Sequence, residues 1–208
     1  FASEKEINQL NLTPNQIQLF EQILSGLLYP SSALRANADT LRANHQGQQG
    51  LWPLAISGDY PILLVRIDHQ EDIGLVNELL QAHAYWRNRN LKIDLVIFNL
   101  KDTGYSEELN ERIRQLLNRR SEDGWLNRRG GIFIVRADQI QQSQRVLLET
   151  AARVILDADR GNLVDQLKRL GQQPRRLPSF TSTASPPEDE SVPPLQRPED
   201  LLFDNGLG

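Results

Sequence analysis

Residues 50–68 read Gly-Leu-Trp-Pro-Leu-Ala-Ile-Ser-Gly-Asp-Tyr-Pro-Ile-Leu-Leu-Val-Arg-Ile-Asp. The run at residues 62–67 is apolar almost throughout, so neither of its faces suits water. This pattern predicts a strand that is buried on both sides in a parallel sheet. A polar turn, Ser57-Gly58-Asp59, leads into the run. We therefore expect residues 62–67 to be the first strand of such a sheet.

Strand-like and helical patterns alternate along the rest of the chain. Strand patterns recur at residues 92–99, 132–136 and 153–156, and helical patterns at residues 71–89, 106–120, 143–152 and 162–170. The links between them are short, which favours right-handed crossovers with helices on both faces of the sheet. The predicted fold class is α/β, a three-layer sandwich with a three- or four-stranded, mostly parallel sheet.

The two ends of the chain differ from this central region. Residues 13–16, Thr-Pro-Asn-Gln, have the pattern of a helix start with a capping box, and a second helical piece is expected at residues 31–44. After residue 170 prolines mix with Ser, Thr, Glu and Asp, a composition that cannot build a core. We predict a helical lead-in at 1–50, an α/β domain at 51–170, a disordered linker at 171–200 and the start of a truncated module at 201–208.

Composition narrows the functional classes. The chain has 208 residues, with 23 Lys and Arg against 27 Asp and Glu, giving a net charge of −4, and this balance argues against a nucleic-acid partner. It has no cysteine, which excludes disulfides and thiolate metal sites and fits a cytoplasmic location. No apolar run is long enough to cross a bilayer, so no membrane contact is expected. Because the chain starts at Phe1 and lacks methionine, we expect it to be a piece of a longer protein.

Four aspartates fall at or just after predicted strand ends: Asp68, Asp102, Asp138 and Asp157. Ligands of parallel sheets bind beyond this edge, so the carboxylates could converge on a cation such as Mg²⁺. The favoured interpretation is that they cap helices and turns, since no phosphate-binding glycine loop accompanies them. No cofactor is expected. Residues 63–68 also resemble residues 133–138, placing an arginine and an aspartate at equivalent strand ends.

Other candidate residues each have a structural and a functional interpretation. Ser57, Gly58 and Asp59 lie at the amino end of their strand, which favours a positioning turn over a catalytic loop. His83 shares a helical apolar stripe with Trp86, which favours a hydrogen-bonded, sheet-facing side chain over a general base. Aromatic residues such as Trp52 and Trp86 could stack on sugar rings, although ordinary packing is favoured. These residues make no self-sufficient catalytic set.

A series of motifs runs in order through the chain: Leu-Thr-Pro (12–14), Leu-Leu-Tyr-Pro (27–30), Gly-Gln-Gln-Gly-Leu-Trp (47–52), Ile-Ser-Gly-Asp-Tyr-Pro-Ile (56–62), Leu-Val-Arg-Ile (64–67), Ala-His-Ala-Tyr-Trp-Arg (82–87), Asp-Leu-Val-Ile (94–97) and Asn-Gly-Leu-Gly (205–208). Together they resemble a segment of the cyclic β-1,2-glucan synthases and their relatives. Those large bacterial proteins contain modules related to the inverting disaccharide phosphorylases, formerly glycosyltransferase family 36. Two positions depart from the family pattern: Ala55, where a glycine is expected, and Ala84, where an acid is common.

The resemblance implies a segment between carbohydrate-associated β-sandwich modules, ahead of a helical (α/α)₆ catalytic barrel. The expected role is a non-catalytic accessory domain of a glycosyltransferase or phosphorylase that processes β-glucan, associated with the inner membrane through other parts of the polypeptide. The expected partners are the neighbouring sandwich and barrel modules, with β-glucan as a further candidate. The contact candidates are Trp52, Ser57, Gly58, Asp59, His83, Trp86 and Arg87. The alternatives are a Mg²⁺-dependent phosphoryl-transfer enzyme using the strand-end aspartates and a carbohydrate-binding module.

Overall fold

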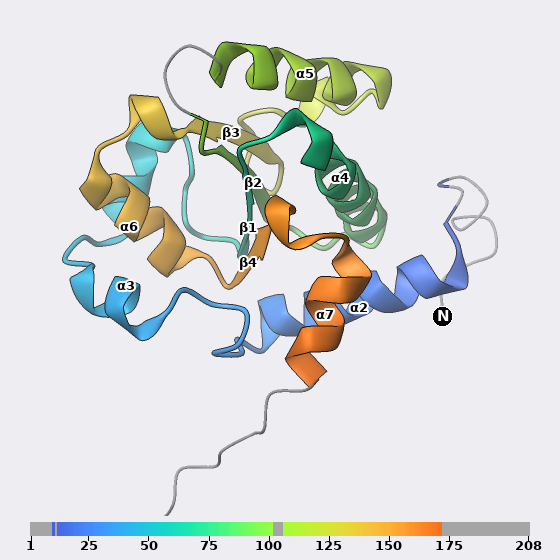
Figure 1. Ribbon diagram of the computed structural model, residues 1–208, viewed down its shortest axis with the longest axis horizontal. Helices are drawn as coiled ribbons and strands as arrows, with labels where there is room; N and C mark the ends of the chain where they lie inside the picture. The colour runs from blue at the N-terminus through green and yellow to red at the C-terminus, as the bar shows by residue number, and fades with distance from the viewer. Residues whose placement is uncertain (1–9, 11, 102–105, 172–208) are drawn as a thin grey trace, which may run out of the picture. The chain divides into compact units, whose positions relative to one another are not determined.

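The computed structural model describes residues 10, 12–101 and 106–171. The helices are α2 (Pro14–Leu28), α3 (Ala38–Ala43), α4 (Ile73–Asn88), α5 (Ser106–Arg119), α6 (Gln142–Ala151) and α7 (Leu163–Gly171), and the strands are β1 (Ile62–Ile67), β2 (Asp94–Asn99), β3 (Ile132–Arg136) and β4 (Val154–Asp157) (Figure 1). Short 3₁₀ helices include η1 (Gln48–Leu54) and η3 (Asp123–Trp125). The linker predicted beyond Gly171 and the module start predicted at residues 201–208 lie outside the described residues.

The described strands form one parallel sheet in the order β3-β2-β1-β4. Strand β1 is internal: Leu63 pairs with Leu95 of β2 on one side and with Val154 of β4 on the other. Strand β2 pairs in turn with β3, Leu95 lying opposite Ile132. The predicted α/β class and the parallel sheet are confirmed. The first described strand, β1, pairs with a neighbouring strand on each side.

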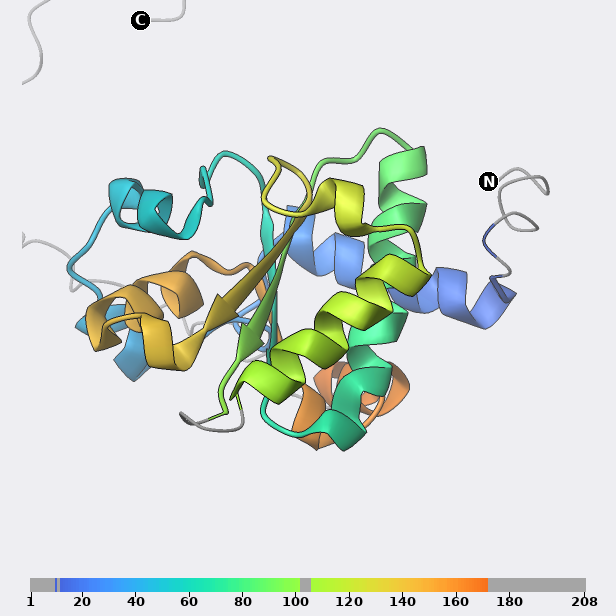
Figure 2. The ribbon, with the colours of Figure 1, turned by 90° about the horizontal axis from the view of Figure 1, so that it is seen from above.

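The two faces of the sheet are covered by different helices. Successive side chains of a strand point to opposite faces, and accordingly Leu63 and Val65 join one core cluster while Ile62 and Leu64 join the other. Residues from α2, α4, α5 and α7 complete the first cluster, and residues from η1 and α6 complete the second (Figures 1 and 2). The predicted three-layer arrangement follows, with burial of each large aliphatic side chain contributing roughly 1.5–3 kcal/mol.

Helix α2 begins as its sequence predicts. The Thr13 hydroxyl accepts a hydrogen bond from the Gln16 backbone N–H (3.3 Å), and the Gln16 side chain accepts one from the Thr13 backbone N–H (2.9 Å), which is a complete capping box. The buried face of the helix then carries Phe20, whose ring lies 6.5 Å from that of Trp86 of α4 in an edge-on arrangement. Helix α2 therefore shares a core with the sheet domain.

The helix expected at residues 31–44 is shorter than predicted. Only Ala38–Ala43 is helical, because Asn37 acts as the N-cap and its side chain accepts a hydrogen bond from the Thr40 backbone N–H (2.8 Å). Helix α3 buries none of its residues. Across the described residues, no helix combines the length and the apolar character that crossing a membrane would require.

Candidate functional site

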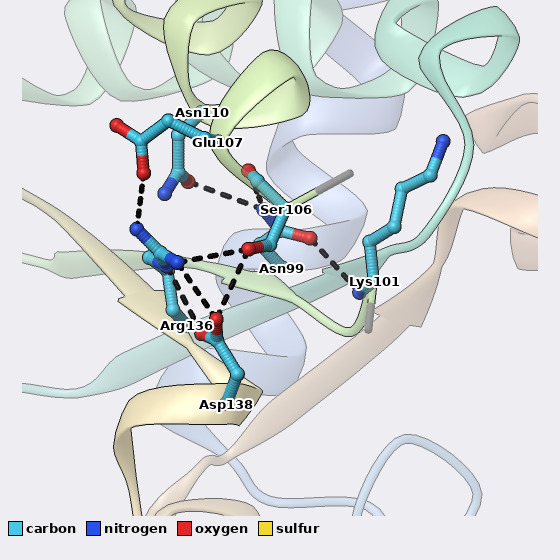
Figure 3. Close-up of polar contacts among 7 residues, drawn as sticks. All are labelled: Asn99, Lys101, Ser106, Glu107, Asn110, Arg136 and Asp138. Atoms are coloured by element: carbon cyan, nitrogen blue, oxygen red, sulfur yellow. Dashed lines mark hydrogen bonds and ion pairs between the residues drawn. The ribbon is translucent and has the colours of Figure 1, made fainter. Parts of the chain in front are cut away.

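The carboxyl ends of β2 and β3 carry a dense polar group, here called the Arg136 cluster: Asn99, Ser106, Glu107, Asn110, Arg136 and Asp138 (Figure 3). The Arg136 guanidinium donates from Nε and Nη2 to the two oxygens of Asp138 (3.0 and 2.7 Å) and from Nη2 to Ser106 Oγ (2.8 Å). It also pairs with Glu107. The hydrogen bond from Arg136 holds the pKa of the Asp138 carboxyl below its ordinary value.

Asn99, the last residue of β2, anchors the start of α5 within this cluster. Its Nδ2 donates to the Ser106 backbone carbonyl (2.9 Å) and to Asn110 Oδ1 (3.2 Å), and its Oδ1 accepts from the Lys101 backbone N–H (2.9 Å). The side chain is fully buried. Because its donors and its acceptor are all engaged within the protein, Asn99 serves to join strand and helix.

A second polar group, here called the Arg66 cluster, lies at the carboxyl ends of β1 and β4. The sheet register places Arg66 directly opposite Asp157, and Arg66 Nε donates to Asp157 Oδ1 (2.5 Å). Arg160 Nε pairs with the other oxygen of Asp157 (2.9 Å). Glu149 of α6 accepts from Arg66 (3.4 Å) and from Arg145 (3.3 Å). Both buried acids are thus neutralised by arginines.

Of the predicted metal-binding aspartates, Asp68 and Asp157 line one pocket together with Arg66 and Arg160, whereas Asp138 lies elsewhere. Asp138 follows β3 and Asp157 ends β4, and these strands are opposite edges of the sheet. Asp68, after β1, pairs with its neighbour His69 (2.6 Å), and Asp102 lies outside the described residues. Asp138 and Asp157 therefore do not converge, and a metal site shared by the other aspartates, the less favoured alternative, stays a prediction. Asp157 is the N-cap residue of the 3₁₀ helix Ala158–Arg160, but the carboxylates of Asp138 and Asp157 bind arginines, so the favoured interpretation of capping stays a prediction for these residues.

One compact set of possible metal ligands does occur in the described part of the chain. A ligand atom from each of Asp68, His69 and Asp72 lies within 4.8 Å of the others. Asp72 and His69 were not singled out by the sequence pattern. His69 is exposed and Asp68 and Asp72 are partly exposed, so water competes strongly for these groups. The set shares only Asp68 with the predicted four.

The Ser57-Gly58-Asp59 turn lies at the amino end of β1, as predicted. Gly58 has a φ of +76°, and a Cβ there would come 2.8 Å from Gln48 Cγ, so glycine is required both by conformation and by space. Gln48 of η1 donates from Nε2 to the Ser57 carbonyl (2.7 Å) and to Asp59 Oδ1 (3.1 Å). Asp59 also pairs with Arg129. The turn thus ties η1 and the loop before β3 to the start of β1.

Asp94, the first residue of β2, was missed by the sequence analysis. It is fully buried, and its Oδ1 accepts a hydrogen bond from the Gly130 backbone N–H (2.7 Å). Burial raises the pKa of the carboxyl to about 6, although the Gly130 hydrogen bond and the charge of Arg129 oppose the rise. The signal was present as an acid at the head of an otherwise apolar strand. The hydrogen bond that Asp94 accepts from Gly130 fixes the loop that enters β3.

Two of the three predicted candidates on α4, His83 and Trp86, are buried, and the third, Arg87, is partly exposed. His83 is 0% exposed and donates its Nε2 hydrogen to the Ile93 carbonyl (3.0 Å), and burial, aided by the charge of Arg87, lowers the pKa of its imidazole to about 4. Trp86 is also 0% exposed. Arg87 pairs with Glu122 (2.8 Å) and lies over the ring of Trp125 at 4.2 Å. His83 and Trp86 accordingly offer no surface to a ligand or a neighbouring module.

Trp52 is different, because 59% of it is exposed. It belongs to η1, which continues into Ala55, a residue with a φ of +62° in the left-handed region. Ala55 is the position at which the family resemblance led us to expect a glycine. The backbone geometry explains that expectation, since glycine adopts positive φ without the steric cost that a Cβ imposes.

The fold and these clusters define the class of protein: a parallel-sheet α/β domain whose described strand-end acids are engaged in ion pairs and hydrogen bonds. No protein-family model matches the chain. The chain is 33% identical over 171 residues to the cyclic β-(1,2)-glucan synthase NdvB of Rhizobium meliloti (strain 1021). The match covers 80% of this chain and 6% of the relative. The predicted relationship to cyclic β-1,2-glucan synthases is thereby confirmed, and the wider link to disaccharide phosphorylases stays a prediction.

Proposed function

We propose that this chain is a non-catalytic accessory module of a multidomain protein that makes or processes β-glucan, of the cyclic β-1,2-glucan synthase kind. The proposal rests on the acids near the carboxyl ends of the strands, the edge where parallel-sheet enzymes normally bind their ligands. There the acids Asp138, Glu149 and Asp157 are bound by arginines of the same domain. Such groups hold elements together and are poorly placed to act as acids, bases or ligands. The small share of the long relative that the chain covers also suits a module.

The surface that would meet neighbouring modules includes exposed aromatic side chains. Trp52 and Tyr29 are 59% and 78% exposed, and Leu28 beside Tyr29 is also exposed. Aromatic residues are favoured at protein interfaces, so each of these exposed side chains is a candidate contact. We propose β-sandwich and (α/α)₆ barrel modules of the same polypeptide as the partners. Glycosyl transfer, and any association with the inner membrane, would reside in those other parts.

The catalytic half of the proposal is tested on the 208-residue chain itself. We expect no product when it is incubated with UDP-glucose, or with β-1,2-glucan and inorganic phosphate. Glucosyl transfer or phosphorolysis that disappears in Asp138→Asn would contradict the accessory role. The Mg²⁺-dependent alternative now depends on Asp68, His69 and Asp72, and a saturable heat of Mg²⁺ or Mn²⁺ binding that is lost in Asp72→Asn would favour it.

The accessory half is tested in the longer parent protein. Trp52→Ser should leave the melting temperature of the isolated chain unchanged, because the side chain is mostly in water. In the parent it should weaken module packing, which limited proteolysis would detect as faster cleavage on either side of the domain. Gln115→Ser, an exposed change on α5, serves as the control. Equal cleavage rates in the wild type and Trp52→Ser would remove Trp52 from the interface.

A further inference from the structure

A pocket of about 220 Å³ lies where β1 and β4 end, and we call it the Arg35 pocket. Its walls come from residues 33–40, from β1 and β4, from α6 and from η5 (Ala158–Arg160). The strand order reverses here, because the chain places β2 and β3 on one side of β1 and then adds β4 on the other. In open parallel sheets, ligands bind outside the carboxyl ends of the strands at such a reversal. The topology therefore favours a ligand at this pocket.

Three arginines line the Arg35 pocket, and each comes from a different segment: Arg35 precedes α3, Arg66 lies in β1 and Arg160 ends η5. Each guanidinium is held by contacts that engage only part of it. Arg35 donates from Nη2 to the Thr150 carbonyl (2.9 Å), and Arg160 pairs through Nε with Asp157 (2.9 Å). Side chains that are already held lose little conformational entropy when a ligand binds.

The held arginines keep N–H groups for a ligand. Arg66 uses Nε for Asp157 and Nη1 for Glu149, and its Nη2 has no partner in the part of the chain that the structure describes. Arg35 Nη1 and the two Nη atoms of Arg160 are likewise without a partner among the described residues. Among the unpartnered nitrogens of Arg35 and Arg66, only Arg35 Nε is out of contact with solvent. The Nη groups are therefore open to a ligand.

The acids of the lining, Glu149 and Asp157, are each bound by two arginines. Arg66 binds both acids. Arg145 is the second partner of Glu149, and Arg160 is the second partner of Asp157. The side chains of the two acids are only 11% and 12% exposed. They accordingly position the arginines, and the accessible charge belongs to the guanidinium groups.

Arg35 adds a positive charge that no acid offsets in the described part of the chain. Around the pocket, four arginines therefore face two acids, which leaves a surplus of two positive charges. An adjoining pocket of about 170 Å³ shares Arg66 and Arg160 but adds Asp68 and Asp159 to its lining. The surplus positive charge thus lies on the side of residues 33–40, where the rest of the lining is uncharged.

We propose that the Arg35 pocket binds a small dicarboxylate. Guanidinium groups bind planar carboxylates through paired N–H donors, and hydrogen bonds between charged groups are the stronger kind. Because the three arginines come from separate segments, their donors suit an anion whose charge is divided between two ends. The volume restricts this anion to a compact molecule. The inference goes beyond the accessory role, which requires no ligand.

The test titrates the complete 208-residue chain with malonate at constant ionic strength and follows backbone amides by NMR. We expect saturable shifts confined to residues 33–40, 66–67 and 155–160. Malonamide, which has nearly the same shape without the charge, should cause none of these shifts.

Two substitutions examine the arginines themselves. Arg35→Gln and Arg160→Gln should each weaken malonate binding by roughly tenfold or more, the usual effect of losing a hydrogen bond to a charged group. Because Arg35 also holds the Thr150 carbonyl, Arg160→Gln supplies a variant that keeps this contact. Arg42→Gln, which removes an exposed charge of α3 outside the pocket, is the matched control and should leave the affinity unchanged.

Several results would overturn the proposal. They are the absence of saturable shifts, shifts that map elsewhere, equal responses to malonate and malonamide, and wild-type affinity in Arg160→Gln. Inorganic phosphate compares the distribution of charge: tighter binding of phosphate than of malonate would contradict a dicarboxylate site. None of these results bears on the glucosyl-transfer assays, so the accessory role is judged separately.

Discussion

At the scale of single residues, two alanines distinguish this chain from the pattern of the family it resembles. Ala55 has a positive φ at the end of η1, where its backbone N–H reaches the carbonyls of Leu51 and Trp52. Ala84 lies within α4 with only 7% of its surface exposed. The first position carries strain that glycine would relieve, and the second is buried, which is a costly place for the acid expected there.

We expect Ala55→Gly to stabilise the protein, because removing the Cβ relieves a left-handed conformation that costs about 1 kcal/mol. The greater freedom of glycine in the unfolded chain offsets part of this, leaving a net gain of roughly 0.5 kcal/mol. Urea denaturation monitored by tryptophan fluorescence measures the change. Ala84→Gly is the matched control and should destabilise by about 1 kcal/mol, as in other helix interiors. A loss of stability in Ala55→Gly would show that this loop is not strained.

At the scale of elements, a buried carboxylate helps to fasten the start of β2 to the loop before β3. Asp94 accepts the Gly130 N–H, and Gly130, with a φ of +69°, directs the chain into β3. The charges of Arg129 and Asp59 lie close enough to act on the pKa of Asp94 in opposite directions. The link between β2 and the loop before β3 is therefore sensitive to protonation of Asp94. The arginine pairs at the carboxyl ends of the strands differ in this respect.

This carboxylate should make stability fall as pH rises from about 4 to about 6. The pKa of Asp94 is about 6 in the folded protein and near 4 in an unfolded chain. Between these values the folded state binds more protons, so raising the pH favours unfolding, by about 2 kcal/mol in all. The measurement is the free energy of unfolding in urea across this range. Asp94→Asn should flatten the slope in this window, and an unchanged slope would rule out Asp94 as its source.

The elements themselves follow from their apolar runs, and the sequence predicted most of them to within a few residues. The polar clusters that join different elements could not be predicted from these runs. Arg136 and Asp138 are two residues apart, and their shared pattern with Arg66 and Asp68 was visible. However, Arg66 binds Asp157, not Asp68, because β4 adds to β1 with these residues in register. The order of the strands in the sheet decides that Arg66 pairs with Asp157. No local sequence pattern in β1 or β4 predicts this order.

At the scale of the whole described unit, residues on both sides of the boundary predicted at residue 50 share one core. Phe20 and Ile23 of α2 are fully buried in the same cluster as Trp86 of α4. Leu34 from the segment after α2 belongs to that cluster too, and its carbonyl accepts a hydrogen bond from the Ile155 N–H of β4 (2.8 Å). The residues predicted as a lead-in are thus part of the structure that supports the sheet.

Phe20→Ala should cost about 3–5 kcal/mol, the usual penalty for removing a buried phenylalanine. A fragment that begins at residue 50 should show low helix content by circular dichroism and no cooperative melting, because Trp86 and Tyr85 would lose the cover of α2. Tyr29→Ala, at a mostly exposed side chain just after the same helix, should change stability by less than about 0.5 kcal/mol. A fragment from residue 50 that melts cooperatively near the temperature of the full chain would contradict this prediction.

The position of β1 between β2 and β4 also sets an order of events during synthesis. The partner on one side, β2, follows after a single helix, but Leu63 must wait for Val154 before its other side is paired. Contacts between residues so distant in sequence form late and slow folding. The unpaired side of β1 is therefore open to other strands while the ribosome makes α5, β3 and α6. That interval is when correct pairing within this domain most needs protection.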